Sequence, residues 1–133
     1  VRGLNGFAWP ATFMAVDKSM LPEVKEGFLA PYGSWADRVA VHRFVQDIPM
    51  HSKHPSWDTL VQVENSLERL QDTPMLICWG GQDFCFHDHF YKEWTRRFPA
   101  AQKLYFPEAG HYVLEDAFPE VVENLLPFLK RCL

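Results

Sequence analysis

The chain has 133 residues, 47% of them hydrophobic and 23% charged, so it forms one domain at most and is not disordered by composition. Its net charge is −4 and its basic residues cluster no further than pairs such as Arg96-Arg97, which argues against a nucleic-acid partner. No apolar run approaches the length of a membrane span, and 3 cysteines without CxxC spacing indicate reduced thiols in a cytoplasmic protein.

Residues 1–55 are cut by prolines into short segments, and every element expected there is a helix. The first is a short helix over residues 21–29. Ser34 and Asp37 then form a capping-box pattern, and the apolar residues after them recur at helical spacing. This predicts an amphipathic helix over residues 35–48. No strand pattern is found before residue 70.

The pattern changes in residues 56–133, where helices and strands alternate. Residues 58–70 carry apolar residues at helical spacing, which predicts a helix with one buried face. The apolar run 75–79 predicts a strand buried on both faces and ended by Gly80-Gly81. The remaining expected elements are a helix over about 88–98, a short strand over 103–106, and a final helix that begins near Pro119 and is kinked at Pro127.

This alternation predicts an α/β fold with a parallel sheet. Only two strands are expected, and two parallel strands leave open edges and bury too little surface to be stable alone. We therefore expect the other strands to lie elsewhere, most simply upstream of Val1. The predicted partner is this missing N-terminal half of the fold, supplied in cis or as another chain.

Two loops follow the C-terminal ends of the predicted strands, where an open parallel sheet binds its ligands. The first loop offers the carboxylate of Asp83, and the second offers the imidazole of His111. Neighbouring parallel strands are about 4.8 Å apart, so the two side chains can meet. A carboxylate bonded to one ring nitrogen fixes the tautomer of a histidine and stabilises its protonated form. The pair is therefore a candidate for the acid and the base of a catalytic triad.

Both loops resemble those of a known superfamily. The segment 79–83, Trp-Gly-Gly-Gln-Asp, resembles the W-G-x-x-D acid loop of α/β-hydrolases, and Gly110-His111-Tyr112 resembles their catalytic-histidine loop. The amino-acid sequences of four further segments resemble those of the haloalkane-dehalogenase-like branch. Within that branch they are most similar to the β-lactone-processing hydrolases of bacterial olefin biosynthesis. These segments are Asn5-Gly6-Phe7-Ala8-Trp9-Pro10, Ala30-Pro31-Tyr32, Phe44-Val45-Gln46-Asp47-Ile48-Pro49 and Asp83-Phe84-Cys85-Phe86.

The resemblance covers essentially the whole chain. It implies a partial helical cap in residues 1–55, with Val1 inside the cap, and the C-terminal part of an α/β-hydrolase core in residues 56–133. It also implies an enzyme: a hydrolase that acts on an apolar small molecule, either a haloalkane or a lipid-derived β-lactone. The triad would consist of a nucleophile, His111 and Asp83, and the reaction would need neither a metal nor an organic cofactor.

The nucleophile of that family does not occur in this sequence. Neither a G-x-S-x-G nor a G-x-D-x-G turn is found in the 133 residues, and the oxyanion-hole loop does not occur either. We therefore expect the chain to be inactive alone. In the dehalogenase-like branch the nucleophile would be an aspartate that forms an ester intermediate, and His111 would then activate water or assist the next step.

Aromatic and thiol side chains near these motifs are candidates for the wall of an apolar pocket. The predicted substrate-binding residues are Phe7, Trp9, Phe13, Phe84, Cys85, Phe86 and Tyr112. Ordinary packing is the alternative for each of them, and a reactive thiol is a further alternative for Cys85. His87 and His89 begin a helix and point in different directions, so no metal site is expected there. Asp88 between them is interpreted as the N-cap of that helix.

Two other functions stay open. With a serine nucleophile the complete protein would be an esterase or lactonase, and with an aspartate and cap tyrosines such as Tyr32 it would be an epoxide hydrolase. Alternatively, the chain is a non-catalytic binding partner with a vestigial site. A cooperative unfolding transition of the isolated monomer would favour that second class.

Overall fold

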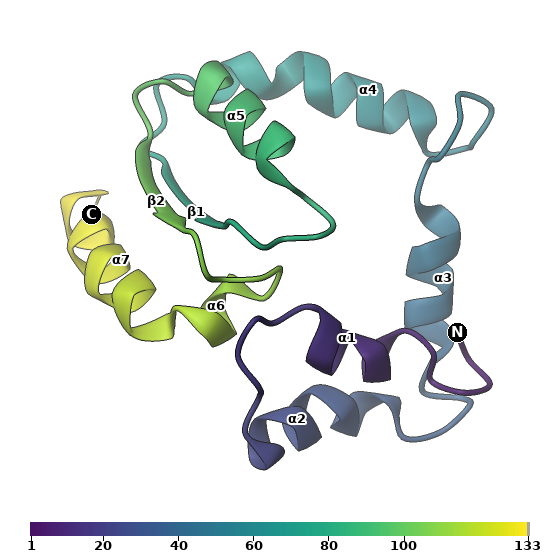
Figure 1. Ribbon diagram of the computed structural model, residues 1–133. Coiled ribbons are helices and arrows are strands. Elements are labelled where there is room, and N and C mark those ends of the chain that lie inside the picture. The colour runs from purple at the N-terminus through teal and green to yellow at the C-terminus, as the bar shows by residue number, and fades with distance from the viewer. Residues whose placement is uncertain (133) are drawn as a thin grey trace. The chain divides into compact units, whose positions relative to one another are not determined.

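The computed structural model describes residues 1–132 (Figure 1). The chain forms two compact units. Unit 1 consists of residues 1–10 and 22–71, and unit 2 of residues 11–21 and 72 onwards. The boundary near residue 10 falls within the first helix, α1 (Ala8–Met14). Within residues 1–132, no helix combines the length and the apolar composition that crossing a membrane requires.

Unit 1 contains short helices joined by turns. They are α2 (Pro22–Leu29), the 3-10 helix η1 (Ala30–Tyr32), α3 (Val39–Asp47), α4 (Trp57–Ser66) and the 3-10 helix η2 (Leu67–Leu70). The prediction for residues 21–29 is confirmed, and Pro22 occupies the first helical position, where its missing N–H is no loss. The sequence does not predict helix α1, in which Pro10 is the third residue and so lies in the first turn, where a missing N–H costs no intrahelical bond.

The predicted capping box forms, yet the helix after it begins later than predicted. The Asp37 N–H donates to Ser34 Oγ at 3.3 Å, and the Ser34 N–H donates to Asp37 Oδ2 at 3.0 Å. A turn follows, in which the Arg38 guanidinium donates to backbone carbonyl oxygens of residues 32 and 33. Regular helix α3 therefore starts only at Val39.

Helices α4 and η2 together cover the predicted helix over 58–70, but the face expected to be buried is not. Leu60 is 50% exposed and Val63 is 55% exposed. Helical spacing identifies which residues share a face, whereas burial also requires a surface that packs against that face. Residues 1–132 do not supply such a surface for this stripe, so the expectation of burial is wrong for them.

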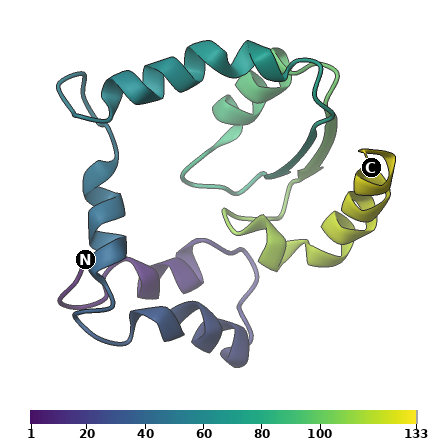
Figure 2. The same cartoon turned by 180° about the vertical axis from the view of Figure 1, so that it is seen from behind.

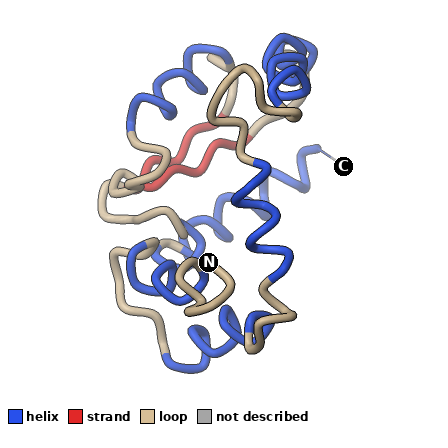
Figure 3. Tube along the Cα trace, turned by 90° about the vertical axis from the view of Figure 1, so that its right-hand side faces the viewer, coloured by secondary structure: helices blue, strands red, loops and turns tan. Residues whose placement is uncertain are grey.

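Unit 2 contains two parallel strands, β1 (Leu76–Gly80) and β2 (Gln102–Phe106), paired in register from Leu76↔Gln102 to Gly80↔Phe106 (Figure 3). Besides the end of α1, its helices are α5 (Asp88–Arg97), α6 (Val113–Asp116) and α7 (Phe118–Cys132). The order strand, helix, strand and the α/β class are confirmed, with each strand boundary within one residue of its prediction. Such an arrangement is compatible with part of a hydrolase-like fold. Helix α6 was not predicted, and α7 continues through Pro127.

The pleat of the strands separates two packing faces, because successive side chains point to opposite sides. On one face, the ring centroid of Tyr91 of α5 lies 5.9 Å from that of Trp79 and 4.9 Å from that of Tyr105. On the other face, Cys78 and Phe106 pack against the cluster formed with α6 and α7. Accordingly, α5 and α7 lie on different sides of the strand pair (Figure 1, Figure 2).

The buried core of the described residues is small. Its hydrophobic members are Ala15, Ile77, Phe98, Ala101, Ala109, Ala117 and Val121, and most of them are alanines. The expectation that β1 is buried on both faces is met only in part, since Ile77 is buried whereas Cys78 and Trp79 are half-buried. Large apolar side chains contribute little to this core, so little apolar surface is removed from water.

Candidate active site

The two predicted loops are hydrogen-bonded to each other just beyond the strands. The Gly81 N–H donates to the Phe106 carbonyl oxygen at 2.8 Å, and the Gln82 N–H donates to the Ala109 carbonyl oxygen at 2.9 Å. The Gln82 side-chain amide also donates to the Pro107 carbonyl oxygen at 2.9 Å. These bonds continue the pairing of β1 and β2 into the loops, and so fix where each loop side chain begins.

Gly80 allows the close approach of the two loops. A Cβ atom at this position would lie 2.2 Å from the Gly110 carbonyl oxygen and 2.5 Å from the Ala109 carbonyl oxygen. Both distances are far below van der Waals contact, and both atoms belong to the backbone, so they cannot rotate away. Only glycine fits between the end of β1 and the loop of His111.

The carboxylate of Asp83 is buried, with 9% of the residue exposed, and both of its oxygens accept hydrogen bonds. Its Oδ1 accepts the backbone N–H groups of Cys85 and Phe86, each at 2.8 Å. Its Oδ2 lies 2.9 Å from Nδ1 of His111. The turn of the acid loop therefore orients one oxygen, which leaves the other directed at the imidazole.

These contacts lower the pKa of Asp83. Burial alone would raise it, but the hydrogen bonds from the Phe86 N–H, the His111 ring and the Cys85 N–H outweigh burial, and the pKa lies below its ordinary value of 3.8. The carboxylate is therefore ionised at neutral pH. An ionised carboxylate can only accept, so Nδ1 of His111 carries the proton and Nε2 is the basic nitrogen.

Aromatic rings surround the imidazole of His111, whose side chain is 29% exposed. The ring centroids of Phe86, Tyr112 and Phe84 lie 5.5, 5.7 and 6.0 Å from its own. Phe84 is 60% exposed and Phe86 is 45% exposed, so both offer apolar surface. Cys85, between them, has an exposed side chain. The structure thus brings four of the predicted pocket residues to the acid–histidine pair, while their contact with a substrate stays a prediction.

Three further residues were predicted to line the pocket from the cap. Phe7 and Trp9 belong to unit 1, where Lys25 Nζ lies 5.5 Å from the centroid of the Trp9 ring. Phe13 belongs to unit 2 and is 51% exposed. A role for these three residues in substrate binding also stays a prediction.

Asp116 is a residue of the site region that sequence reasoning missed. It is 4% exposed, and its carboxylate accepts the N–H of Gly110, directly before His111, at 2.7 Å. The same carboxylate accepts the N–H groups of Asp17 and Lys18, each at 2.9 Å. Of these contacts, only the one between Gly110 and Asp116 joins residues that are close in the sequence. No sequence pattern marks the contact with residues 17 and 18, which lie almost a hundred positions away.

The start of α5 differs from its prediction. His87 is the N-cap, with Nδ1 accepting the His89 N–H at 3.4 Å, and Asp88 is the first helical residue. The interpretation of Asp88 as the N-cap is therefore wrong. Its carboxylate instead accepts the Tyr105 hydroxyl at 2.7 Å and so links α5 to β2. This hydrogen bond raises the pKa of Tyr105. Within residues 1–132, no three His, Cys, Asp or Glu side chains gather as metal ligands would.

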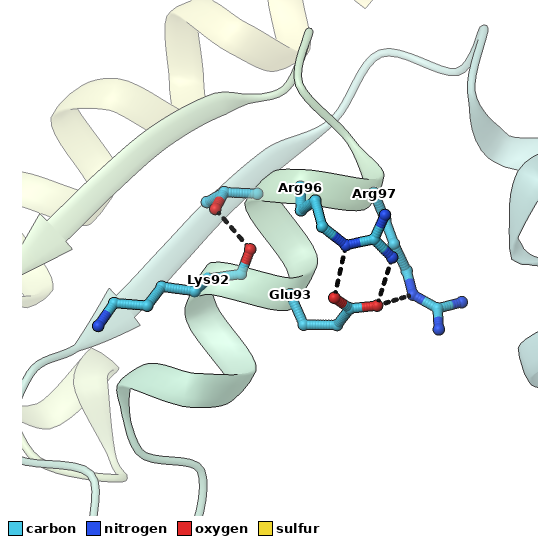
Figure 4. Close-up of polar contacts among 5 residues, drawn as sticks. Lys92, Glu93, Arg96 and Arg97 are labelled. Carbon is cyan, nitrogen blue, oxygen red and sulfur yellow. Dashed lines mark hydrogen bonds and ion pairs between the residues drawn. The ribbon is translucent and has the colours of Figure 1, made fainter.

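A charged cluster lies on the exposed side of α5 (Figure 4). Glu93 accepts two hydrogen bonds from Arg96, at 2.7 and 2.8 Å, and one from Arg97 at 2.6 Å. Hydrogen bonds from the two arginines lower the pKa of Glu93 to about 2. Exposed pairs of this kind contribute little to stability, so Glu93 provides a neutral position for control variants.

A pocket of about 450 Å³ lies in unit 1. It is lined by Ala40, Arg43, Phe44, Gln46, Asp47, His54 and Pro55. The polar groups of His54 are used locally: Nε2 is 3.0 Å from the Gln46 carbonyl oxygen, and Nδ1 accepts the Ser56 N–H at 3.2 Å. No predicted site residue lines this pocket, so it adds no chemistry to the acid–histidine pair.

Fold and site together define an α/β protein with an aspartate–histidine pair at the C-terminal ends of two parallel strands. No protein-family model matches the chain. The chain is similar to two enzymes named cis-3-alkyl-4-alkyloxetan-2-one decarboxylase. That of Shewanella oneidensis is 38% identical over 130 residues, which are 97% of this chain and 41% of the relative. That of Xanthomonas campestris is 35% identical over 131 residues, which are 98% of this chain and 44% of the relative.

The chain thus spans about two fifths of the length of these two relatives. A shorter similarity, 36% identity over 58 residues, links it to the dihydrolipoyllysine-residue acetyltransferase component of the acetoin cleaving system of Pseudomonas putida. That match covers 44% of this chain and 15% of the relative. All three relatives are named as enzymes, and the two longer matches carry the name of a β-lactone decarboxylase.

Proposed function

We propose that the chain is the C-terminal part of a β-lactone-processing enzyme of the α/β-hydrolase type, in the haloalkane-dehalogenase-like branch. Asp83 and His111 would be its catalytic acid and base. The observation that carries the proposal is the 2.9 Å contact between Asp83 Oδ2 and His111 Nδ1 beyond two adjacent parallel strands. Similarity to two oxetan-2-one decarboxylases over nearly the whole chain supports the substrate class.

The proposed substrate is a lipid-derived β-lactone with alkyl chains on ring carbons 3 and 4. An oxetan-2-one is a four-membered lactone, and its 3-alkyl and 4-alkyl groups are apolar. The exposed rings of Phe84 and Phe86 beside His111 offer apolar surface suited to such chains. The ring itself is polar only at its ester group, which would face the acid–histidine pair.

The proposed mechanism gives each member of the pair one task. Nε2 of His111 takes a proton, either from water or from a group of the substrate, and the imidazolium is stabilised by ionised Asp83. The nucleophile, proposed to be an aspartate, would come from the rest of the fold. No step of this proposal requires a metal or an organic cofactor. The fate of the lactone distinguishes two outcomes: hydrolysis keeps every carbon in a β-hydroxy acid, whereas decarboxylation releases CO₂ and leaves an alkene.

The proposed partner of this chain is the N-terminal half of the same fold. Leu4 is 94% exposed, Met50 is 81% exposed and Phe44 is 76% exposed, although a folded protein normally covers such side chains. The strand pair also has edges that residues 1–132 do not cover with a further strand. In this proposal, residues 1–55 belong to the cap and residues 56–133 to the core.

The test uses the complete natural protein and a cis-3,4-dialkyl oxetan-2-one. We expect the enzyme to consume the lactone, and gas chromatography of the products measures this consumption. Replacement His111→Ala should reduce turnover by about 10⁴-fold, since triad members act as a unit. Glu93→Gln, which alters only the charged cluster on α5, should keep the wild-type rate.

Two results would contradict the proposal. If His111→Ala retained wild-type turnover, His111 would not be the base. If the lactone were left intact while simple esters were cleaved, the esterase alternative would replace β-lactone processing. Among positive results, release of CO₂ and an alkene would favour decarboxylation, and accumulation of a β-hydroxy acid would favour hydrolysis.

A further inference from the structure

The carboxylate of Asp116 accepts hydrogen bonds from two parts of the chain that are distant from each other in sequence, the loop of His111 and residues 17–18. Its Oδ2 accepts the N–H of Gly110 at 2.7 Å and the N–H of Asp17 at 2.9 Å, and its Oδ1 accepts the N–H of Lys18 at 2.9 Å. Asp116 is 4% exposed, so these bonds are shielded from water. Hydrogen bonds to an ionised acceptor are about twice as strong as those between neutral groups. Asp116 therefore connects the segment after α1 to the loop of the histidine.

A second connection lies on the other side of His111. The Tyr112 N–H donates to the Ala15 carbonyl oxygen at 2.7 Å. Gly110 permits this approach, because a Cβ atom there would lie 2.8 Å from the same carbonyl oxygen. The residues before and after His111 are thus both held by residues 15–18, one through Asp116 and one directly.

Helix α6 cannot hold the histidine loop by itself. It has only four residues, Val113–Asp116, and a helix of that length is not stable alone. Its last residue is Asp116, whose backbone carbonyl oxygen also accepts the Lys18 ammonium at 2.7 Å. The part of the loop that follows Ala109 therefore depends on the bonds that Asp116 and Tyr112 make with residues 15–18.

We propose that Asp116 is a positioning residue for His111. By holding Gly110 against residues 17 and 18, it keeps the imidazole where Nδ1 donates to Asp83 and Nε2 is presented for proton transfer. This inference rests on the proposed function of the Asp83–His111 pair. Asp116 acts through the backbone and does not itself touch the reacting atoms.

The substitution Asp116→Asn isolates the role of the charge. In aspartate, each oxygen accepts at least one backbone N–H, so an amide in either orientation places an NH₂ group against a backbone donor. The variant keeps the size and shape of the side chain and loses one or two of the three bonds. Glu115→Gln, at an exposed neighbouring position, removes the same charge without these contacts and is the matched control.

The experiment measures the variants in the complete natural protein, with the cis-3,4-dialkyl oxetan-2-one as substrate and NMR of the imidazole as a second readout. For Asp116→Asn, we expect kcat to fall about 10- to 100-fold with little change in KM, because a displaced base affects the chemical step. The Nδ1 proton resonance of His111 should broaden or disappear. Glu115→Gln should match the wild type in both readouts, and Asp116→Glu should restore part of kcat.

The inference would be overturned if Asp116→Asn kept both the wild-type kcat and the His111 Nδ1 resonance. A readout that needs no variant is amide hydrogen exchange in the wild type, where Asp17, Lys18 and Gly110 should be strongly protected. Exchange of these amides at the rate of exposed loops would overturn the inference as well. Failure of the proposed function has a different signature: Asp116→Asn would alter the imidazole resonance, while His111→Ala would leave lactone turnover unchanged.

Discussion

At Asp83, the two carboxylate oxygens have different tasks. Oδ1 is held by two backbone N–H groups of its own turn, and Oδ2 accepts from the imidazole of His111. The local turn therefore sets the direction of the second oxygen before any ligand is present. A side chain that still accepted the backbone N–H groups, but could not accept from the imidazole, would show which effects come from loop geometry and which from proton transfer.

Asp83→Asn is such a change, and we expect it to preserve the fold and abolish most activity. The amide oxygen can still accept from Cys85 and Phe86, while the NH₂ group faces Nδ1 of His111 and forces the proton onto Nε2. This wrong tautomer cannot act as a base, and the expected loss in kcat is about 10⁴-fold. The measurement is lactone turnover of the complete protein, with circular dichroism as the control for folding. Wild-type turnover in Asp83→Asn would exclude Asp83 as the acid.

The lowered pKa of Asp83 also predicts a pH dependence of stability. The folded chain holds this pKa below its ordinary value of 3.8, so folding favours the ionised form. The resulting stabilisation is fully present above the pKa of the unfolded chain, and it is lost as the pH falls through the lower pKa of the folded chain. Urea unfolding at several pH values below about 4 should therefore show a steeper loss of stability for the wild type than for Asp83→Asn. Parallel curves would contradict this assignment.

At the scale of elements, the junction between β1 and the histidine loop leaves no room for a side chain at Gly80. We expect Gly80→Ala to destabilise the protein by about 1–3 kcal/mol, as overpacking does elsewhere, because its Cβ would press on the carbonyl oxygens of Ala109 and Gly110. Gly27→Ala in α2 is the matched control, since no atom lies within 4 Å of its Cβ. A helical alanine there should add about 0.5–1 kcal/mol. Equal urea midpoints for the two variants would rule out the steric argument.

Local patterns in the sequence predict most of the elements. Strand β1 follows from an apolar run bounded by Gly80-Gly81, and β2 from a short run bounded by Pro107. The sequence also predicts the meeting of Asp83 with His111, because two neighbouring parallel strands that end at the same edge bring their loops together. Such features are set within a few residues, or by one pairing of strands.

Features that depend on distant segments were not predictable. The approach of Asp116 to residues 17 and 18 has no local signature, and the burial of the α4 stripe depends on what packs against it. Asp88 illustrates the same limit, since a hydrogen bond to Tyr105 on β2 replaced the expected capping role. In each case, tertiary contacts decide between alternatives that the local sequence leaves equal.

At the scale of the whole molecule, the distribution of apolar side chains is unusual. The buried core consists largely of alanines, whereas many large apolar residues are more than a third exposed. A stable domain normally buries its largest apolar side chains, since each contributes about 1.5–3 kcal/mol when covered. The exposed surface supports the proposal that another part of the fold covers this chain.

This distribution leads to a prediction for the chain expressed alone. We expect residues 1–133 to bind the dye ANS strongly and to self-associate, because their large apolar side chains face solvent. The complete protein, at equal molar concentration, should bind much less dye and remain monodisperse by light scattering. A monomeric chain with a sharp cooperative unfolding transition would instead favour the non-catalytic binding partner.

The bond between Asp17 and Asp116 has a consequence for biosynthesis. These residues are 99 positions apart, so the loop of His111 acquires its native anchor only after Asp116 has followed Asp17 out of the ribosome. At about 5–20 residues per second, residue 17 waits roughly 5–20 s for its partner. The acid loop can form early, since Asp83 bonds to its own neighbours. The histidine loop is therefore anchored after the acid loop has formed, and a nascent protein of this design has no anchored Asp83–His111 pair until Asp116 has been synthesised.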